Sequence, residues 1–239
     1  MIQFVPETFF MKNNYDIIII GTGSGGGTIA NKLAESGKNI LILERGGFIP
    51  KEKENWDAKE VVVNGRYRPK ENWYDKDDKP FLPFIHYNVG GNSKVYGAAM
   101  FRFRESDFMQ VQHYGGISLA WPFGYETLAP YYDIAEKMYH VHGQRGADPT
   151  EPPASMSYPL PQLPYESLIK DLNSKLMQIG LQPFPLPMGV NLPQDTNKNA
   201  SPVLLQNFDG FPDPTDSKAD AQTAALNKAL MTDNVTMLT

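Results

Sequence analysis

The residues of this chain best suited to chemistry lie in a glycine-rich stretch near its start. Gly21, Gly23 and Gly26 satisfy the spacing G-x-G-x-x-G within the segment GTGSGG. In this pattern the first glycine forms a tight turn, the second lets the backbone approach a pyrophosphate, and the third lets a helix pack on a strand. A helix that begins here offers free N–H groups to an anion, so we expect Ser24 and Gly25 to contribute to phosphate binding.

An acidic residue completes the pattern. Glu44 ends the apolar run NILIL, where its carboxylate can accept hydrogen bonds from a ribose diol. Arg45 follows directly and would suit a 2′-phosphate, although the preceding acid disfavours one. The stretch predicts a dinucleotide site that includes both residues. By itself it leaves FAD and NAD open, because both present the same ADP moiety.

The elements that must position these residues form a βαβ unit. Residues 15–20 (YDIIII) are a compact apolar run, typical of a strand buried on both faces of a parallel sheet. Residues 28–36 have helical spacing and end before Gly37, and residues 39–43 form a second buried strand. A right-handed crossover follows from the chirality of the chain, and we expect a Rossmann-like α/β fold.

Later helices are predicted from apolar periodicity. One carries a stripe over residues 131–141 with Pro130 in its first turn. A second begins at Ser167 and stops at Gly180, and a third covers residues 218–231.

The remaining segments lack such periodicity. Residues 51–79 carry mainly charges and a few aromatic anchors, and we expect them to be solvated. Residues 147–164 are rich in proline and expected to be extended. Residues 181–217 form a long loop, which indicates a functional lid or missing packing partners. Residues 235–238 begin a strand for which nothing later supplies a neighbour.

Composition excludes several classes of protein. The net charge of −5 argues against a surface for nucleic acid or anionic lipid, and the hydrophobic fraction of 41% supports a core. The absence of cysteine rules out disulfides, thiolate metal sites and cysteine nucleophiles, and fits a reducing compartment. There is no signal-peptide pattern and no run of about 18 apolar residues, so we expect a soluble, cytoplasmic protein without a membrane span.

A second glycine pair lies in HYNVGGNSKVYGAAMFRFRESDF, inside a run of aromatic and β-branched residues where a strand normally avoids glycine. A β-bulge or a hairpin corner would explain Gly90 and Gly91 without a ligand. Glycine also permits close backbone approach, and the small Ala98 and Ala99 leave room for a flat ring. Because the chain also has the upstream glycine loop, ligand contact is the favoured interpretation of Gly90 and Gly91.

Three stretches resemble the glucose–methanol–choline (GMC) family of FAD-dependent oxidoreductases: IIIIGTGSGGGTIANKLAESGKNILILERGG, NVGGNSKVYGAAMFRFRESDF and WPFGYETLAPYYDIAEKMYHVHG. KADAQTAAL followed by NVTMLT looks like a fourth. The resemblance implies that the upstream glycines bind the pyrophosphate, that Glu44 binds the adenosine ribose and that Gly90 and Gly91 pass under the isoalloxazine ring. It also implies contact with the flavin, or through Val235 with the adenine side, for a further set: Asn92, Ser93, Tyr96, Gly97, Ala98 and Val235.

Two departures from the family pattern affect the flavin. Tyr96 stands where many members have Asn, so the hydrogen bonding near the ring differs. Some relatives attach the flavin through a histidine in this stretch, but Lys94 and its neighbours offer none, so we expect non-covalent FAD. His86 lies just upstream, where a packed or solvated side chain is the favoured interpretation.

The resemblance also implies a catalytic histidine near the C-terminus of a longer protein. His113, His140 and His142 fall in a different part of the chain, so we assign no catalytic residue and no metal site. We therefore expect a truncated N-terminal portion. Its expected parts are an N-terminal extension (1–14), the first part of an FAD-binding domain (15–125), the start of an α+β substrate or cap region with proline-rich loops (126–217) and an incomplete return to the FAD-binding domain (218–239).

The implied function is that of an FAD-dependent alcohol or sugar dehydrogenase or oxidase, in which hydride moves from a CH–OH group to flavin N5. The expected partners are a small alcohol or sugar and an electron acceptor of unknown identity. One alternative is a non-catalytic FAD-binding fragment, or one piece of a split enzyme that needs a complementing C-terminal chain. A less favoured alternative is an NAD(P)-dependent dehydrogenase, against which the second glycine pair argues.

Overall fold

A three-stranded parallel sheet forms at the predicted βαβ unit. In the computed structural model, which describes residues 14–192 and 209–239, the strand order is β1-β2-β10. The strands are β1 (Ile17–Ile20), β2 (Ile40–Leu43) and β10 (Val235–Leu238). Their registers bring the carboxyl ends of all three strands to one edge of the sheet. The predicted Rossmann-like α/β class is confirmed.

The last strand finds its neighbour near the start of the chain. β10 pairs in parallel with β2, with Val235 opposite Ile40, and the Ile40 N–H donates to the Asn234 carbonyl at 2.8 Å. The partner lies almost two hundred residues earlier in the chain. Parallel strands need a crossover connection, so sequence order alone does not reveal which strands meet.

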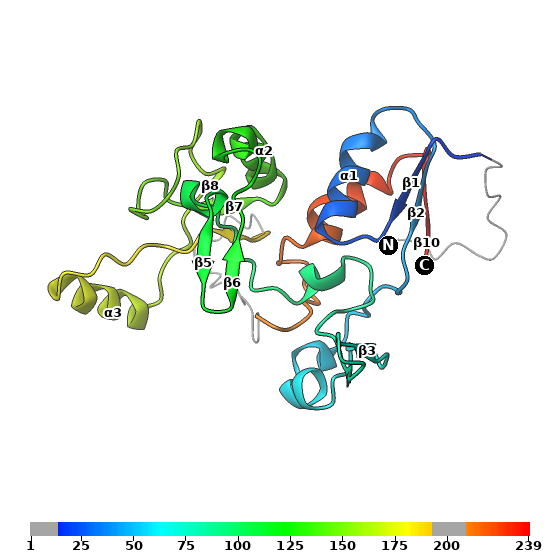
Figure 1. Cartoon of the computed structure of the whole chain (residues 1–239), viewed down its shortest axis with the longest axis horizontal. Coiled ribbons are helices and arrows are strands. Elements are labelled where there is room, and N and C mark those ends of the chain that lie inside the picture. Colours follow the sequence, from blue (N-terminus) through cyan, green and yellow to red (C-terminus); the bar gives the residue numbers. More distant parts are fainter. Residues whose placement is uncertain (1–13, 193–208) are drawn as a thin grey trace.

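Helices cover one face of this sheet. They are α1 (Ser24–Ala34), the π-helix η5 (Gln222–Leu226) and α4 (Asn227–Ala229), which lie together beside β1 and β2 (Figure 1). The core between them includes Ile19, Ala30, Ile40, Ile42 and Leu226, all buried. Burial of these apolar side chains supplies the main driving force for this half of the chain.

The opposite face of the sheet is not covered by the described residues. Ile18 and Ile20 are 60% and 84% exposed, so the prediction that this strand is buried on both faces is wrong for this part of the chain. The reason is the strand order, which leaves β1 at the edge, together with helices on one side only.

Helix α1 begins earlier than its apolar periodicity predicts. The expected helix covers residues 28–36, but the observed one starts at Ser24, because Gly23 has extended backbone and serves as the N-cap. The glycines after it form the first turn, where no apolar residue marks the helix. Beyond the end of α1, Gly37 has a φ of +72°, as expected for the residue after a helix.

The second half of the chain builds a separate lobe around α2 (Tyr125–Met138) and a small mixed sheet (Figure 1). Pro130 lies inside α2 and not in its first turn, which corrects the prediction. The helix starts after Gly124, and its first residues Tyr125 and Leu128 continue the apolar stripe ahead of the proline. The sheet has the order β8-β7-β9, with β7 (Val141–Gly143), β8 (Leu160–Pro161) and β9 (Met188–Gly189).

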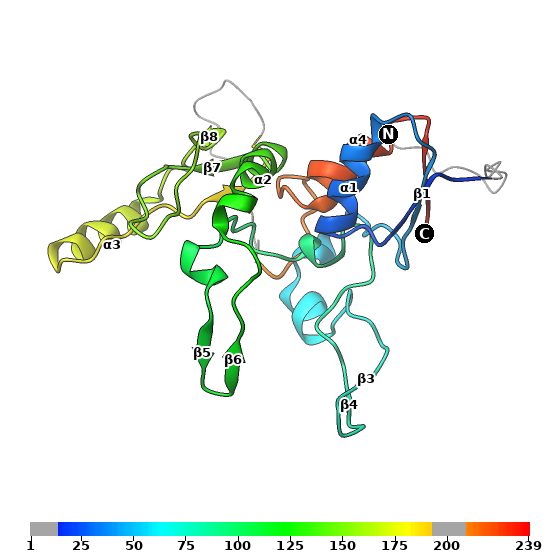
Figure 2. The same ribbon diagram turned by 45° about the horizontal axis from the view of Figure 1, so that its top comes forward.

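Several smaller elements extend from these two lobes. Helix α3 (Ser167–Gln178) forms as predicted, and Gly180 after it has a φ of +83°. Figure 2 shows two hairpins that project from the body, β3 (Trp73–Tyr74) with β4 (Pro80–Phe81), and β5 (Val111–His113) with β6 (Gly116–Ser118). Short helices complete the chain: η1 (Lys53–Trp56), η2 (Lys59–Val63), η3 (Gly91–Lys94) and η4 (Glu105–Phe108).

The solvated character predicted for residues 51–79 is largely observed, but two of its expected aromatic anchors are exposed. Trp73 is 44% and Tyr74 is 65% exposed, and the Trp73 ring packs edge-on against Phe81 in the same hairpin. The Trp73 ring therefore stabilises its own hairpin locally and does not anchor it to the core.

The segment after the second glycine pair joins the two lobes. The Met100 N–H donates to the Pro187 carbonyl at 2.9 Å, and the Gly189 N–H donates to the Ala98 carbonyl at 2.9 Å. Most of the expected N-terminal extension (residues 1–13) and the middle of the long loop (193–208) lie outside the described residues. No described helix is long and apolar enough to cross a membrane.

Candidate functional site

The glycine-rich loop connects the end of β1 to the start of α1. Gly21 has a φ of +88°, and its N–H donates to the Leu43 carbonyl at 2.7 Å. A Cβ atom at Gly26 would lie 2.0 Å from the Gly21 carbonyl oxygen, so the helix approaches the strand more closely than any side chain permits. These two glycines are therefore required by the backbone itself.

Gly23 and Gly25 serve a different purpose. A Cβ atom at either position would meet no atom of residues 14–192 or 209–239 within 4 Å, so both face open space in this part of the chain. Gly23 caps α1 without a side-chain hydrogen bond. The first N–H groups of a helix have no partner within the helix, and they carry the positive end of its dipole. The loop therefore offers donors and unfilled volume for an anionic group such as a pyrophosphate.

The second glycine pair does not lie in a strand. Gly90 and Gly91 have φ values of +92° and +55° and lead into the short helix η3. A Cβ atom at Gly90 would lie 2.8 Å from Cδ of Lys94, and one at Gly91 would lie 3.4 Å from Cα of Gly23. The first glycine thus accommodates a lysine stem, and the second brings the two glycine clusters together.

Thr22 connects the clusters by hydrogen bonds. Its side chain is fully buried, and its hydroxyl accepts the Gly90 N–H at 3.0 Å and contacts Oε2 of Glu44. Sequence reasoning passed over this residue because it occupies an x position of G-x-G-x-x-G. A hydroxyl at that position, beside an acid at the end of the next strand, is the signal that could have revealed it.

The carboxylate of Glu44 is held by the loop. Its Oε2 accepts the Thr22 N–H at 2.9 Å as well as the hydroxyl, and its Oε1 accepts the Gly46 N–H at 3.0 Å. A carboxylate offers about four acceptor positions. One position on Oε1 therefore remains for a ligand hydroxyl, fewer than the ribose diol expected from sequence would use.

Arg45 and Asn92 are engaged by their own neighbourhoods. The Arg45 guanidinium pairs with Glu71 and lies 3.9 Å from the centre of the Tyr87 ring. Oδ1 of Asn92 accepts the His86 N–H at 2.8 Å, so this side chain supports the segment that precedes the glycine pair.

Side chains after the glycine pair turn towards the 219–221 segment. The Ser93 hydroxyl donates to the Gly90 carbonyl at 2.5 Å and accepts the Ala221 N–H at 2.9 Å. The Tyr96 hydroxyl donates to the Ala219 carbonyl at 2.6 Å, and burial raises the pKa of Tyr96 well above its usual value. Both side chains are therefore engaged within the protein.

Small residues end the segment. A Cβ atom at Gly97 would lie 2.9 Å from Oδ1 of Asp209, so a side chain here would displace the Asp209 carboxylate. Ala98 is fully buried with a φ of +56°, a conformation that is unfavourable for alanine.

A buried ion pair beneath the glycine pair is absent from the sequence prediction. Nζ of Lys94 lies 2.7 Å from Oδ2 of Asp220, with the two side chains 6% and 1% exposed. Oδ1 of the same carboxylate accepts the N–H groups of Gln222 and Thr223 at the start of η5. The pair fastens the glycine segment to the helix that covers the sheet.

Val235 is not brought to the glycine loop. It pairs with Ile40 at the start of β2, whereas Gly21 follows the carboxyl end of β1. Its side chain packs in the core. The structure therefore gives Val235 a position at the far end of the sheet from the loop.

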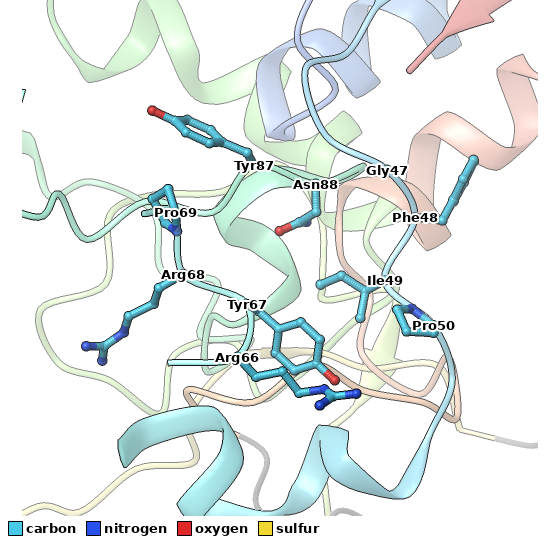
Figure 3. A pocket seen from close by; sticks show the side chains of 10 residues that line it. All are labelled: Gly47, Phe48, Ile49, Pro50, Arg66, Tyr67, Arg68, Pro69, Tyr87 and Asn88. Carbon is cyan, nitrogen blue, oxygen red and sulfur yellow. The ribbon is translucent and has the colours of Figure 1, made fainter. Parts of the chain in front are cut away.

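A surface pocket of about 290 Å³ lies beside the turn that follows β2 (Figure 3). Arg66 on its wall is paired with Glu52 at 2.9 Å, and burial raises the pKa of Tyr67 to about 12. The buried Oδ1 of Asn88 has no hydrogen-bond partner among the described residues. The lining residues are Gly47, Phe48, Ile49, Pro50, Arg66, Tyr67, Arg68, Pro69, Tyr87 and Asn88.

The four histidines do not converge on this site. His113 contacts Ser118, His140 contacts Asn191, and Nδ1 of His142 donates to the Pro161 carbonyl at 2.8 Å. His86 contacts Asn92, and burial lowers its pKa. Within residues 14–192 and 209–239, no group of three or more His, Cys, Asp or Glu residues is arranged to hold a metal ion.

Comparison with known proteins identifies relatives of this arrangement, although no protein-family model matches the chain. The chain is 28% identical to paromamine 6′-oxidase of Streptomyces fradiae, over 74% of its own length and 31% of that protein. It is 31% identical to 2-methyl-1,2-propanediol dehydrogenase of Mycolicibacterium austroafricanum, over 57% of its length and 26% of that protein. It is 25% identical to the fructose dehydrogenase large subunit of Gluconobacter japonicus, over 74% of its own length and 36% of that protein.

Solved structures share the fold. Pyridoxine 4-oxidase from Mesorbium loti matches 94% of this chain with a TM-score of 0.53 and 19% identity, and 42% of that protein is covered. An FAD-dependent oxidoreductase from Chaetomium thermophilum matches 94% of this chain with a TM-score of 0.50 and 16% identity, and 38% of that protein is covered. The chain spans about a third of the length of the curated relatives it matches. The resemblance implied by its motifs is confirmed, and the chain is a homologue of the GMC-type oxidoreductases.

Proposed function

We propose that this chain forms the dinucleotide-binding part of an FAD-dependent oxidoreductase that acts on CH–OH groups of alcohols or sugars. The observation that carries the proposal is the meeting of two glycine clusters, with the Cβ position of Gly91 only 3.4 Å from Cα of Gly23. A dinucleotide is long enough to use both at once, a phosphate at one and a ring at the other. Relatives named for 2-methyl-1,2-propanediol and fructose support an alcohol or sugar substrate.

The glycine loop would hold the pyrophosphate. Gly21 and Gly26 set the close approach of strand and helix, while Gly23, Ser24 and Gly25 form the helix start, which has no side-chain cap and would face the anion. Glu44 would accept a ribose hydroxyl at the remaining position of Oε1. Arg45 would lie beyond this contact, held by Glu71 and Tyr87.

The second glycine pair would support the flavin through its backbone. Gly90 and Gly91 permit close approach, and the residues after them would contribute backbone groups because Ser93 and Tyr96 point to residues 219–221. Gly97 and Ala98 would end this surface with small side chains, and Asn92 would fix its start. No histidine occurs between residues 90 and 98, which supports non-covalent FAD. When bound, FAD supplies the hydride acceptor.

The same contacts support the expected division of the chain. We assign residues 15–125 and 218–239 to the FAD-binding part, because β1, β2 and β10 share one sheet. Residues 126–217 would form the start of the substrate or cap region, with its own small sheet. Val235 would support the sheet and not the adenine.

A second candidate function is FAD binding without turnover, with a complementing chain that supplies the base. It is favoured by the local engagement of all four histidines. An NAD(P)-dependent dehydrogenase is disfavoured, because a nicotinamide site would give no reason for the flavin-like second glycine pair.

Titration of the purified chain with FAD tests the proposal. We expect bound flavin with its visible band at about 450 nm and no comparable binding of NAD. Gly25→Val should abolish binding, because its side chain fills the open space at the helix start. Gly115→Val, at the tip of a hairpin and equally unobstructed, is the matched control and should bind normally. Failure of the wild-type chain to bind FAD would contradict the proposal. Dye reduction by alcohols or sugars separates turnover from binding alone.

A further inference from the structure

Thr22 lies at the junction of the two glycine clusters, and its one hydroxyl forms hydrogen bonds with both Gly90 and Glu44. An amide N–H can only donate and a carboxylate can only accept. The hydroxyl therefore accepts from the Gly90 N–H, at 3.0 Å, and donates its own proton to Oε2 of Glu44. The direction of this chain of hydrogen bonds is fixed by the chemistry of its two ends.

Both ends of the chain belong to the proposed site. Glu44 is fixed by Thr22 twice, through the hydroxyl and through the backbone N–H at 2.9 Å. Gly90 starts the segment that is held in turn by Ser93 and, through the buried pair with Asp220, by Lys94. A shift of the carboxylate therefore moves the hydroxyl, and the hydroxyl is the hydrogen-bond partner of the Gly90 N–H.

We infer that Thr22 is a positioning residue that couples the carboxylate proposed for the ribose to the glycine pair proposed for the flavin. The glycine pattern itself does not demand a hydroxyl here, since it allows any residue at this position. The inference rests on the proposed function for the identity of the ligand. It adds that a ribose bound at Glu44 strengthens the hydrogen bond between Thr22 and the Gly90 N–H. This effect does not require any ligand atom to contact Gly90.

Two substitutions separate the hydroxyl from the shape of the side chain. Thr22→Val keeps the volume but leaves the buried Gly90 N–H without its acceptor. Thr22→Ser keeps the hydroxyl and loses a methyl group. We expect Thr22→Val to weaken FAD binding about tenfold or more and to shift the visible spectrum of the bound flavin. Thr22→Ser should bind FAD within about threefold of wild type and keep the wild-type spectrum.

ADP tests the coupling, because it carries the ribose and pyrophosphate without the flavin. Hydrogen exchange of the Gly90 amide in the full chain should slow on addition of ADP to wild type and Thr22→Ser, and remain unchanged in Thr22→Val at saturating ADP. Equal protection of Gly90 in Thr22→Val would overturn the inference. The inference would also be overturned if Thr22→Ser lost as much FAD affinity and Gly90 protection as Thr22→Val, since the hydroxyl would then not be the group that matters.

The failure of the proposed function would look different. If wild type bound neither ADP nor FAD, the dinucleotide proposal would fail, while exchange without ligand would still test the role of the hydroxyl. In that case Gly90 should exchange at least tenfold faster in Thr22→Val than in Thr22→Ser, in proportion to the loss of one buried hydrogen bond. Equal rates in the two variants would refute the positioning role.

Discussion

Replacing Asp220 by asparagine should destabilise the chain severely, because the buried ammonium of Lys94 loses its carboxylate partner, and Oε1 of Gln222 at 3.2 Å carries no charge to replace it. The Lys94 and Asp220 side chains are 6% and 1% exposed, and their charged atoms are 2.7 Å apart. Breaking a buried ion pair by removing one partner costs about 3–5 kcal/mol. Oδ1 of Asp220, which accepts the N–H groups of Gln222 and Thr223, survives as the amide oxygen in Asp220→Asn. This variant therefore keeps the hydrogen bonds to η5 and replaces the charged acceptor of Lys94 by an NH2 donor.

The assay is urea unfolding, with the free energy extrapolated at a common slope. Asp220→Ala also removes the hydrogen bonds to the start of η5, so it should cost about 1 kcal/mol more than Asp220→Asn. The matched control is Asp77→Asn, which breaks an exposed pair of the same residue types, Lys76 and Asp77, with side chains 87% and 51% exposed. It should cost less than about 1 kcal/mol.

The comparison between the two pairs decides the outcome. If Asp220→Asn cost no more than Asp77→Asn, the buried pair would not be what fastens the glycine segment to η5. A large loss with unchanged FAD affinity in the folded fraction would also count against the reasoning, since the pair holds the segment proposed to face the flavin.

Three further predictions follow from burial and close packing. Gly26→Ala should destabilise the chain by about 1–3 kcal/mol in urea unfolding, because its Cβ would lie 2.0 Å from a carbonyl oxygen. Gly25→Ala, whose Cβ would lie in open space, should not destabilise the chain. A loss for Gly25→Ala as large as that for Gly26→Ala would contradict the role of close packing at Gly26. Burial lowers the pKa of Lys218 from 10.5 to about 8, so between these pH values the unfolded chain binds the extra proton. Its contribution to stability should therefore rise with pH over that range, measured as the difference from Lys218→Met, and a flat difference would refute it. Arg102→Met should cost about 1.5–3 kcal/mol in thermal or urea unfolding, because it removes the guanidinium that lies 2.6 Å from the buried carboxylate of Glu136, while Arg145 still pairs with Oε2 of Glu136 at 2.7 Å. A loss below about 1 kcal/mol would refute the buried pairing.

Local patterns in the sequence predicted the βαβ unit and its glycine loop well. The two apolar runs, Gly37 after the helix and the spacing of the glycine loop all act over a few residues, so periodicity and turn chemistry are sufficient. The start of α1 at Ser24 was missed because its first turn consists of glycines, which carry no apolar signal. The start of α2 ahead of Pro130 was missed because proline is typical of a first helical turn and was taken to mark one.

Contacts between distant segments could not be predicted in this way. Lys94 and Asp220 are 126 residues apart, and lysine is ordinarily exposed, so nothing local indicates that both are buried. The pairing of β10 with β2 depends equally on the tertiary fold. The position of Arg45 directly after Glu44 indicated a role in dinucleotide binding, but its guanidinium pairs with Glu71.

Hydrogen exchange with and without saturating FAD is the most direct test of the central claim that the two glycine clusters form one ligand site. The account predicts that residues 21–27 and residues 88–98 become protected together, while the hairpin at residues 111–118 does not change. Protection of one cluster without the other, or of neither, would contradict it.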